Sequence, residues 1–119
     1  MEVDIKMVDL QEIQSTNGYE KLMEESKTHP VLLFKHSTTC PISATAFDEY
    51  QSFLNHADDS LSAYVIKVIE NRNISNHVEA DTKIKHESPQ IFLIDNKEVS
   101  WHTSHSNITA EAIKNELSM

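Results

Sequence analysis

VLLFKHSTTCPIS, residues 31–43, joins an apolar run to the start of a helix through a short polar turn. The run turns polar only at Lys35, which is typical of a central strand that is buried on both faces. Proline is favoured at the first position of a helix, because it has no N–H group to leave unpaired there. The sequence therefore predicts a strand over 31–36, a turn, and a helix that begins at Pro41.

Cys40 is the only cysteine in the chain and immediately precedes that proline, so it occupies the predicted N-cap of the helix. We expect its sulfur to face unpaired backbone N–H groups there, which together with the helix dipole stabilise a thiolate relative to a thiol. A buried structural cysteine is the alternative. Pro41 and the switch from strand to helix favour a reactive sulfur instead.

Apolar spacing predicts the elements on either side of this motif. Residues 6–10 are expected to form a short strand or an extended entry segment, and a helix capped by Thr16 or Asn17 is expected to run through Tyr19 towards Lys27. We further expect a turn over 58–60, a strand over 63–69, a helix over 71–84, and a strand over 91–94 with an antiparallel partner through Val99 and Trp101. A last helix over 110–117 is expected to begin at Thr109 or Asn107. This order predicts an α/β fold, with a mixed central β-sheet flanked by helices on both faces, in a single domain over 1–119.

The element order, with a cysteine at the strand-to-helix junction, resembles the thioredoxin fold. In thioredoxin-like folds a cis proline lies beside the reactive sulfur, and Pro89 stands just before the strand that starts at Ile91. An ordinary trans proline at the strand entrance is the alternative. We predict a cis Ser88–Pro89 bond that exposes backbone groups of Ser88 to an extended thiol ligand.

Three segments make the resemblance more specific. They are 34–43 (FKHSTTCPIS), 86–90 (HESPQ) and 104–109 (SHSNIT), and they resemble the monothiol bacilliredoxins, small thioredoxin-like proteins of the bacillithiol system. The resemblance extends from about Asp9 to Leu117. It implies a thiol–disulfide oxidoreductase that removes bacillithiol from S-bacillithiolated proteins. Thr82-Lys83-Ile84 departs from the pattern, because it lacks the glycine expected before HESPQ.

Ser43 stands where a Cys-x-x-Cys protein carries its second sulfur, and a hydroxyl cannot resolve a mixed disulfide. Cys40 is therefore expected to act alone, accepting the small thiol as a mixed disulfide that a second thiol or another protein later removes. Ser43 either donates a hydrogen bond to Cys40 or is an ordinary first-turn serine.

The residues around the sulfur are expected to bind the substrate or to tune the sulfur. The predicted substrate-binding residues are Thr39, Pro41, Ser43, Ser88 and Pro89. Lys35 and His36 are candidates for tuning Cys40. As neighbours in a strand they face opposite ways, so at most one of them is near the sulfur.

The composition and charge of the chain limit the kinds of binding partner that we expect. A net charge of −9 argues against a nucleic-acid partner, and no apolar stretch is long enough to cross a membrane. With a single glycine the chain has no glycine-rich phosphate loop. We expect a cytoplasmic protein with no cofactor, for which bacillithiol is a thiol co-substrate and S-bacillithiolated proteins are the partners.

Two other functions stay open at this stage. One is an iron–sulfur carrier of the monothiol-glutaredoxin type, although Pro41 stiffens the loop where glycine would allow close backbone approach. The other is a non-catalytic thioredoxin-like binding module. No metal site is predicted, because the spacing of His86, His102 and His105 does not bring imidazoles to a common ion.

Overall fold

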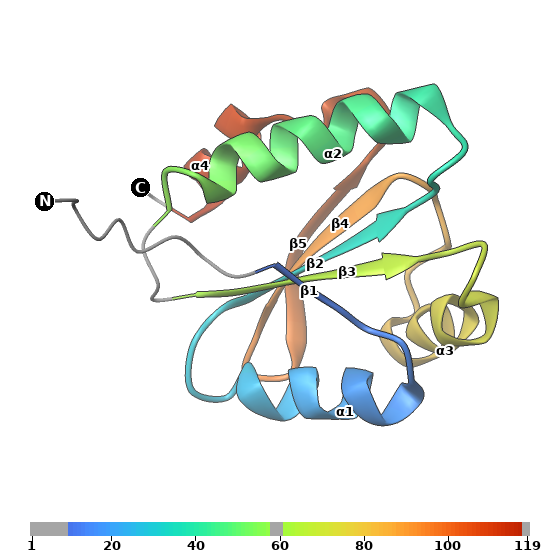
Figure 1. Cartoon of the computed structure of the whole chain (residues 1–119). Coiled ribbons are helices and arrows are strands. Elements are labelled where there is room, and N and C mark those ends of the chain that lie inside the picture. Colours follow the sequence, from blue (N-terminus) through green and yellow to red (C-terminus); the bar gives the residue numbers. More distant parts are fainter. Residues whose placement is uncertain (1–9, 58–60, 118–119) are drawn as a thin grey trace, which may run out of the picture.

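The structure is a computed structural model that describes residues 10–57 and 61–117, and it has the predicted order of elements (Figure 1). The elements in this part of the chain are β1 (Leu10–Glu12), α1 (Thr16–Glu25), β2 (Val31–His36), α2 (Pro41–Leu54), β3 (Ser62–Lys67), α3 (Arg72–Thr82), β4 (Gln90–Asp95), β5 (Glu98–Ser104), the short 3₁₀ helix η1 (His105–Asn107) and α4 (Ala110–Glu116). Most of the strand predicted over 6–10 and the turn predicted over 58–60 lie outside the described residues.

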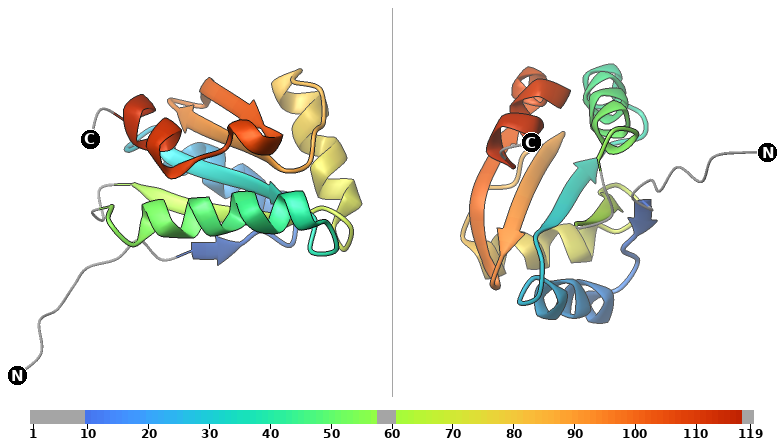
Figure 2. Two further views of the ribbon diagram at one scale, coloured as in Figure 1. Left: turned by 90° about the horizontal axis from the view of Figure 1, so that it is seen from above. Right: turned by 90° about the vertical axis from the view of Figure 1, so that its left-hand side faces the viewer.

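The described strands form one mixed sheet in the order β1-β3-β2-β4-β5. β3 pairs in parallel with β1 and β2, whereas β4 runs antiparallel to both β2 and β5. Helices α2 and α4 cover one face and α1 and α3 cover the other, as two views show (Figures 1 and 2). The predicted mixed sheet with helices on both faces is confirmed.

Strand β2 is the centre of the molecule, and all six of its residues are buried. Its side chains alternate between the two faces, as the period of a strand requires. Leu32 and Phe34 pack beneath α2 and α4, whereas Val31 and Leu33 pack against α1 and α3. The prediction that residues 31–36 form a strand buried on both faces is confirmed.

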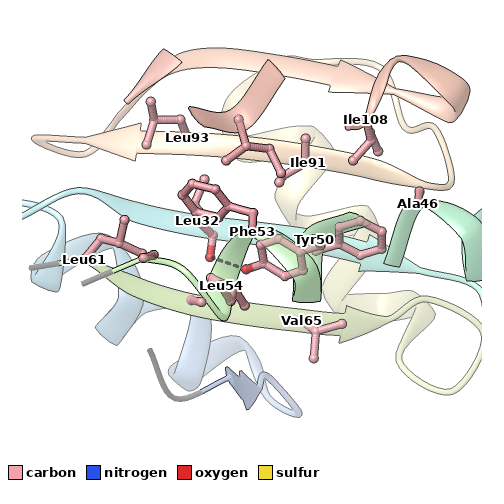
Figure 3. Close-up of a cluster of buried hydrophobic side chains, with 14 residues drawn as sticks. Leu32, Ala46, Tyr50, Phe53, Leu54, Leu61, Val65, Ile91, Leu93 and Ile108 are labelled. Atoms are coloured by element: carbon pink, nitrogen blue, oxygen red, sulfur yellow. Dashed lines mark hydrogen bonds between the residues drawn. The ribbon is translucent and has the colours of Figure 1, made fainter. Parts of the chain in front are cut away.

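Aromatic packing joins α2 to the sheet (Figure 3). The ring of Tyr50 stacks on Phe34 with centroids 5.0 Å apart, and its hydroxyl donates to the backbone oxygen of Tyr64 at 3.1 Å. Burying an apolar or aromatic side chain of this size stabilises a fold by about 1.5–3 kcal/mol. This packing fixes α2, and with it the residue at its N-terminus.

The predicted N-cap of α1 is wrong. Ser15 caps this helix, with an extended backbone and a side-chain oxygen that accepts a hydrogen bond from the Gly18 N–H at 3.0 Å. Thr16 and Asn17 already lie in the first turn of the helix. All three residue types are good caps, so the sequence alone does not select among them.

Helix α3 ends without glycine at Lys83, which takes the left-handed conformation with φ of 61°. A glycine would adopt this backbone without steric cost. The departure noted in the sequence at Thr82-Lys83-Ile84 is therefore accommodated by a lysine in a left-handed cap, and the chain continues to the HESPQ segment.

Candidate functional site

Cys40 is the N-cap of α2, as predicted. A tight turn follows β2, in which the Cys40 N–H donates to the oxygen of Ser37 at 3.2 Å. Pro41 takes the first helical position, and the Cys40 carbonyl accepts the first helical bond from Ala44 at 3.0 Å. Cys40 is partly exposed.

The expectation that the sulfur faces the first-turn N–H groups is not met. Cys40 makes no side-chain capping hydrogen bond to any described residue. Pro41 supplies no N–H for such a bond, and Cys40 instead lines a neighbouring pocket.

The pocket beside Cys40 has a volume of about 230 Å³. Its wall comes from four segments, which are the turn after β2, the loop after β3, the first turns of α3 and the loop before β4. Cys40 and Ser88 are the predicted site residues that line it, together with Ile69, Arg72, Ser75 and His86 among others. Thr39 and Pro41 are exposed beside Cys40 in the sequence, outside the wall of this pocket.

The Ser88–Pro89 bond is cis, as predicted. The Pro89 carbonyl accepts a hydrogen bond from the N–H of His105 at 2.9 Å, which ties this loop to the end of β5. The Ser88 hydroxyl is buried and has no hydrogen-bond partner among the described residues. Buried polar atoms are nearly always paired, so an unpaired hydroxyl in the loop that lines the pocket is unusual. The predicted use of the Ser88 backbone stays a prediction.

Ser43 is fully buried, and its hydroxyl holds the turn between β2 and α2. It lies 2.8 Å from Nδ1 of His36 and accepts a hydrogen bond from the Ser37 N–H at 2.9 Å. These bonds favour a structural first-turn serine over a donor to Cys40. The second sulfur of a Cys-x-x-Cys protein is replaced here by a hydroxyl that is already engaged.

Lys35 and His36 point to opposite faces of the sheet, as predicted. The ring of His36 stacks on Phe47 of α2, with centroids 4.4 Å apart. Burial is the main cause that lowers the pKa of His36, and the nearby charge of Lys67 lowers it further. His36 therefore helps to hold the Ser43 hydroxyl on the face of the sheet that α2 covers.

Lys35 lies on the other face, beneath the pocket. Its Nζ donates to the backbone oxygen of Ser75 at 3.2 Å and lies 3.1 Å from Nδ1 of His86. Burial lowers the pKa of Lys35 to about 8, against the opposing charge of Glu79. Burial and then the neighbouring Lys35 lower the pKa of His86. Of the two tuning candidates, Lys35 is therefore the one that contacts the pocket wall.

His86 and Arg72 were not among the predicted site residues. His86 belongs to the HESPQ segment, which was the signal in the sequence that could have placed it at the site. Arg72 comes shortly after the strand predicted over 63–69, and parallel neighbours end at the same edge of a sheet. That rule places it near Cys40. No group of three or more His, Cys, Asp or Glu in residues 10–57 and 61–117 is arranged to hold a metal.

Comparison with solved structures confirms the thioredoxin fold. A structure described as a proposed oxidoreductase with this fold is 34% identical, with a TM-score of 0.81 over 89% of this chain and 91% of that one. Thioredoxin from Malassezia sympodialis is 13% identical (TM-score 0.77, covering 98% of this chain and 95% of that one). Thioredoxin from Fasciola hepatica is 10% identical (TM-score 0.74, covering 91% and 96%). The last two show the fold alone.

A cysteine at a helix N-terminus, and a cis Ser88–Pro89 bond whose serine lines the same pocket, are typical of thiol redox proteins of the thioredoxin class. The family is more specific. Residues 11–113 match the model of the monothiol bacilliredoxin BrxC, and the chain belongs to this family. The resemblance drawn from the three sequence segments is thereby confirmed. No helix in the described part of the chain is long and apolar enough to cross a membrane.

Proposed function

We propose that this protein removes bacillithiol from S-bacillithiolated proteins by a monothiol mechanism, with bacillithiol as co-substrate and the cytoplasm as its place of action. The observation that carries the proposal is that Cys40 is partly exposed while Ser43, three positions later, is buried. A partly exposed cysteine is the N-cap residue of α2, and the position of a resolving sulfur holds a buried, hydrogen-bonded hydroxyl. Membership of the monothiol bacilliredoxin family supports it.

The reaction is a thiol–disulfide exchange in two steps. The Cys40 thiolate attacks the bacillithiol sulfur of the mixed disulfide, and the protein sulfur leaves with the electron pair of the broken bond and takes up a proton. Cys40 then holds bacillithiol as a mixed disulfide. A second thiol attacks that disulfide and restores Cys40. No second cysteine of this chain takes part, since the chain has one.

The test is recovery of the free thiol on an S-bacillithiolated substrate protein, followed with a thiol dye. The wild-type protein should release the substrate thiol, and Cys40→Ser should release none, because a hydroxyl does not attack a disulfide. Thr45→Ser, an exposed change in the same helix, is the matched control and should retain full activity. Equal release by wild type and Cys40→Ser would refute the proposal.

A further inference from the structure

The pocket beside Cys40 follows from the topology of the sheet. β2 and β3 are parallel neighbours whose last residues, His36 and Lys67, pair with each other. The chain leaves β2 for α2 on one face and leaves β3 for α3 on the other (Figure 1). Where the connections of adjacent strands diverge in this way, a crevice opens at the carboxyl ends of the strands, and α/β proteins bind ligands there.

The charge of the pocket wall differs from that of the molecule. The chain carries 19 acidic residues and a net charge of −9, yet no aspartate or glutamate is among the described residues that line this pocket. The charged or titratable groups in the wall besides Cys40 are Arg72 and His86. Arg72 is the only arginine in the chain.

Arg72 is exposed at the first position of α3. A cation at the start of a helix interacts unfavourably with the helix dipole, so this arginine does not stabilise α3 by that route. A planar guanidinium binds a carboxylate through two parallel hydrogen bonds. Its position at the pocket mouth therefore suits recognition of an anion.

A second basic group, the buried amine of Lys35, lies behind the pocket wall. Ser75 and His86 line the wall, and both contact the buried amine of Lys35. Two carboxylates lie nearby, but neither is among the residues that line the pocket. Glu79 accepts a hydrogen bond from the His86 backbone N–H at 3.0 Å, and Glu87 pairs with His105 at 3.5 Å.

We propose that this pocket holds the small-thiol half of the mixed disulfide, and that Arg72 selects a thiol that carries a carboxylate. The inference deepens the proposed function and rests on it for the identity of the thiol, since bacillithiol carries the carboxylates of its malate group. Ser88 also lines this pocket, and its hydroxyl has no hydrogen-bond partner among the described residues.

The size of the pocket supports binding of the small-thiol half, rather than the protein half, of the mixed disulfide. Its volume of about 230 Å³ is below the ~300–1,000 Å³ of sites that enclose a drug-sized ligand. It accommodates part of a small thiol and no folded segment of a protein. Cys40 then meets the small-thiol sulfur first, forms the new S–S bond with it, and the protein leaves as the reduced thiol.

The test uses a pair of small disulfides that differ in charge alone, dithiodipropionate and its uncharged diamide. Each reacts with the Cys40 thiolate to give a mixed disulfide and one released thiol, which takes up the proton. The rates of adduct formation are followed by acid quenching and intact-mass spectrometry. Arg72→Gln should slow the reaction with the anionic probe by about two- to fivefold, the worth of one exposed ion pair, and leave the rate with the diamide unchanged. Arg72→Lys should restore part of the loss.

Lys114→Gln is the matched control, because it removes the same charge from α4 on the opposite face of the sheet. It should change neither rate. An equal loss in Arg72→Gln and Lys114→Gln, or an equal loss for both probes in Arg72→Gln, overturns the pocket assignment.

The outcome is separable from that of the proposed function. If the protein removes bacillithiol but Arg72→Gln does not selectively slow the anionic probe, this inference is wrong and the proposed function stands. If Arg72→Gln selectively slows the anionic probe but the protein transfers no bacillithiol, the proposed function is wrong and the pocket is a site for another acidic thiol.

Discussion

At the scale of single residues, a buried amine is the least expected feature of this site. Lys35 is fully buried in the central strand and contacts Ser75 and His86. Its Nζ also lies 5.8 Å from the centre of the Phe92 ring. Burying a charge without an ion-pair partner is costly, which is why the pKa of Lys35 falls to about 8.

This pKa predicts how stability depends on pH. The unfolded chain keeps the Lys35 proton up to the ordinary pKa of 10.5, whereas the folded protein releases it near 8. Between these values the unfolded state binds more protons, so stability should rise with pH, and below about 8 the full cost of burial should be present. The free energy of unfolding of the wild type should rise by about 1–3 kcal/mol over this pH range, and Lys35→Met should abolish the rise. Urea unfolding of both proteins at about pH 7 and about pH 10 measures it. The same rise in Lys35→Met would show that another group is responsible.

The sequence predicted part of this residue-level picture. The alternation of a strand placed Lys35 and His36 on opposite faces, and a lone cysteine before a proline predicted the N-cap of α2. The partners of Lys35 could not be predicted, because Ser75 and His86 are 40 and 51 residues away along the chain. Such contacts depend on how α3 packs under the sheet.

At the scale of elements, the helix caps show where sequence reasoning reaches its limit. Thr109 was one of two candidates for the start of the last helix, and it caps α4 by accepting a hydrogen bond from the Ala112 N–H at 3.1 Å. For α1 the predicted caps were wrong, since three consecutive residues, Ser15, Thr16 and Asn17, all have side chains that cap helices. Only the backbone conformation distinguishes them.

The α1 cap gives a direct test with an internal control. Ser15→Ala removes the bond to the Gly18 N–H and should destabilise the protein by about 1 kcal/mol. Thr16→Ala lies one residue further, inside the helix, and should be neutral or slightly stabilising, because alanine is the better helix former. Thermal unfolding of the two variants compares them. A larger loss in Thr16→Ala would mean that the helix begins elsewhere.

At the scale of the whole molecule, three loops that are distant in sequence meet at one end of the sheet. The turns after β2 and β3 and the cis-proline loop before β4 jointly line the pocket. The order of elements predicted this convergence, because strands β2 and β3 are parallel and β4 enters from the same end. It could not predict the cationic wall, since that depends on which side chains of α3 face the crevice.

Intact-mass spectrometry of the protein after mixing with an S-bacillithiolated substrate tests the central claim most directly. Wild type should gain the mass of one bacillithiol on Cys40 while the substrate loses it. Ser43→Cys should pass through the same adduct and end as an internal disulfide, because the new sulfur can resolve it. A wild-type protein that stays unmodified while the substrate remains blocked would contradict the account.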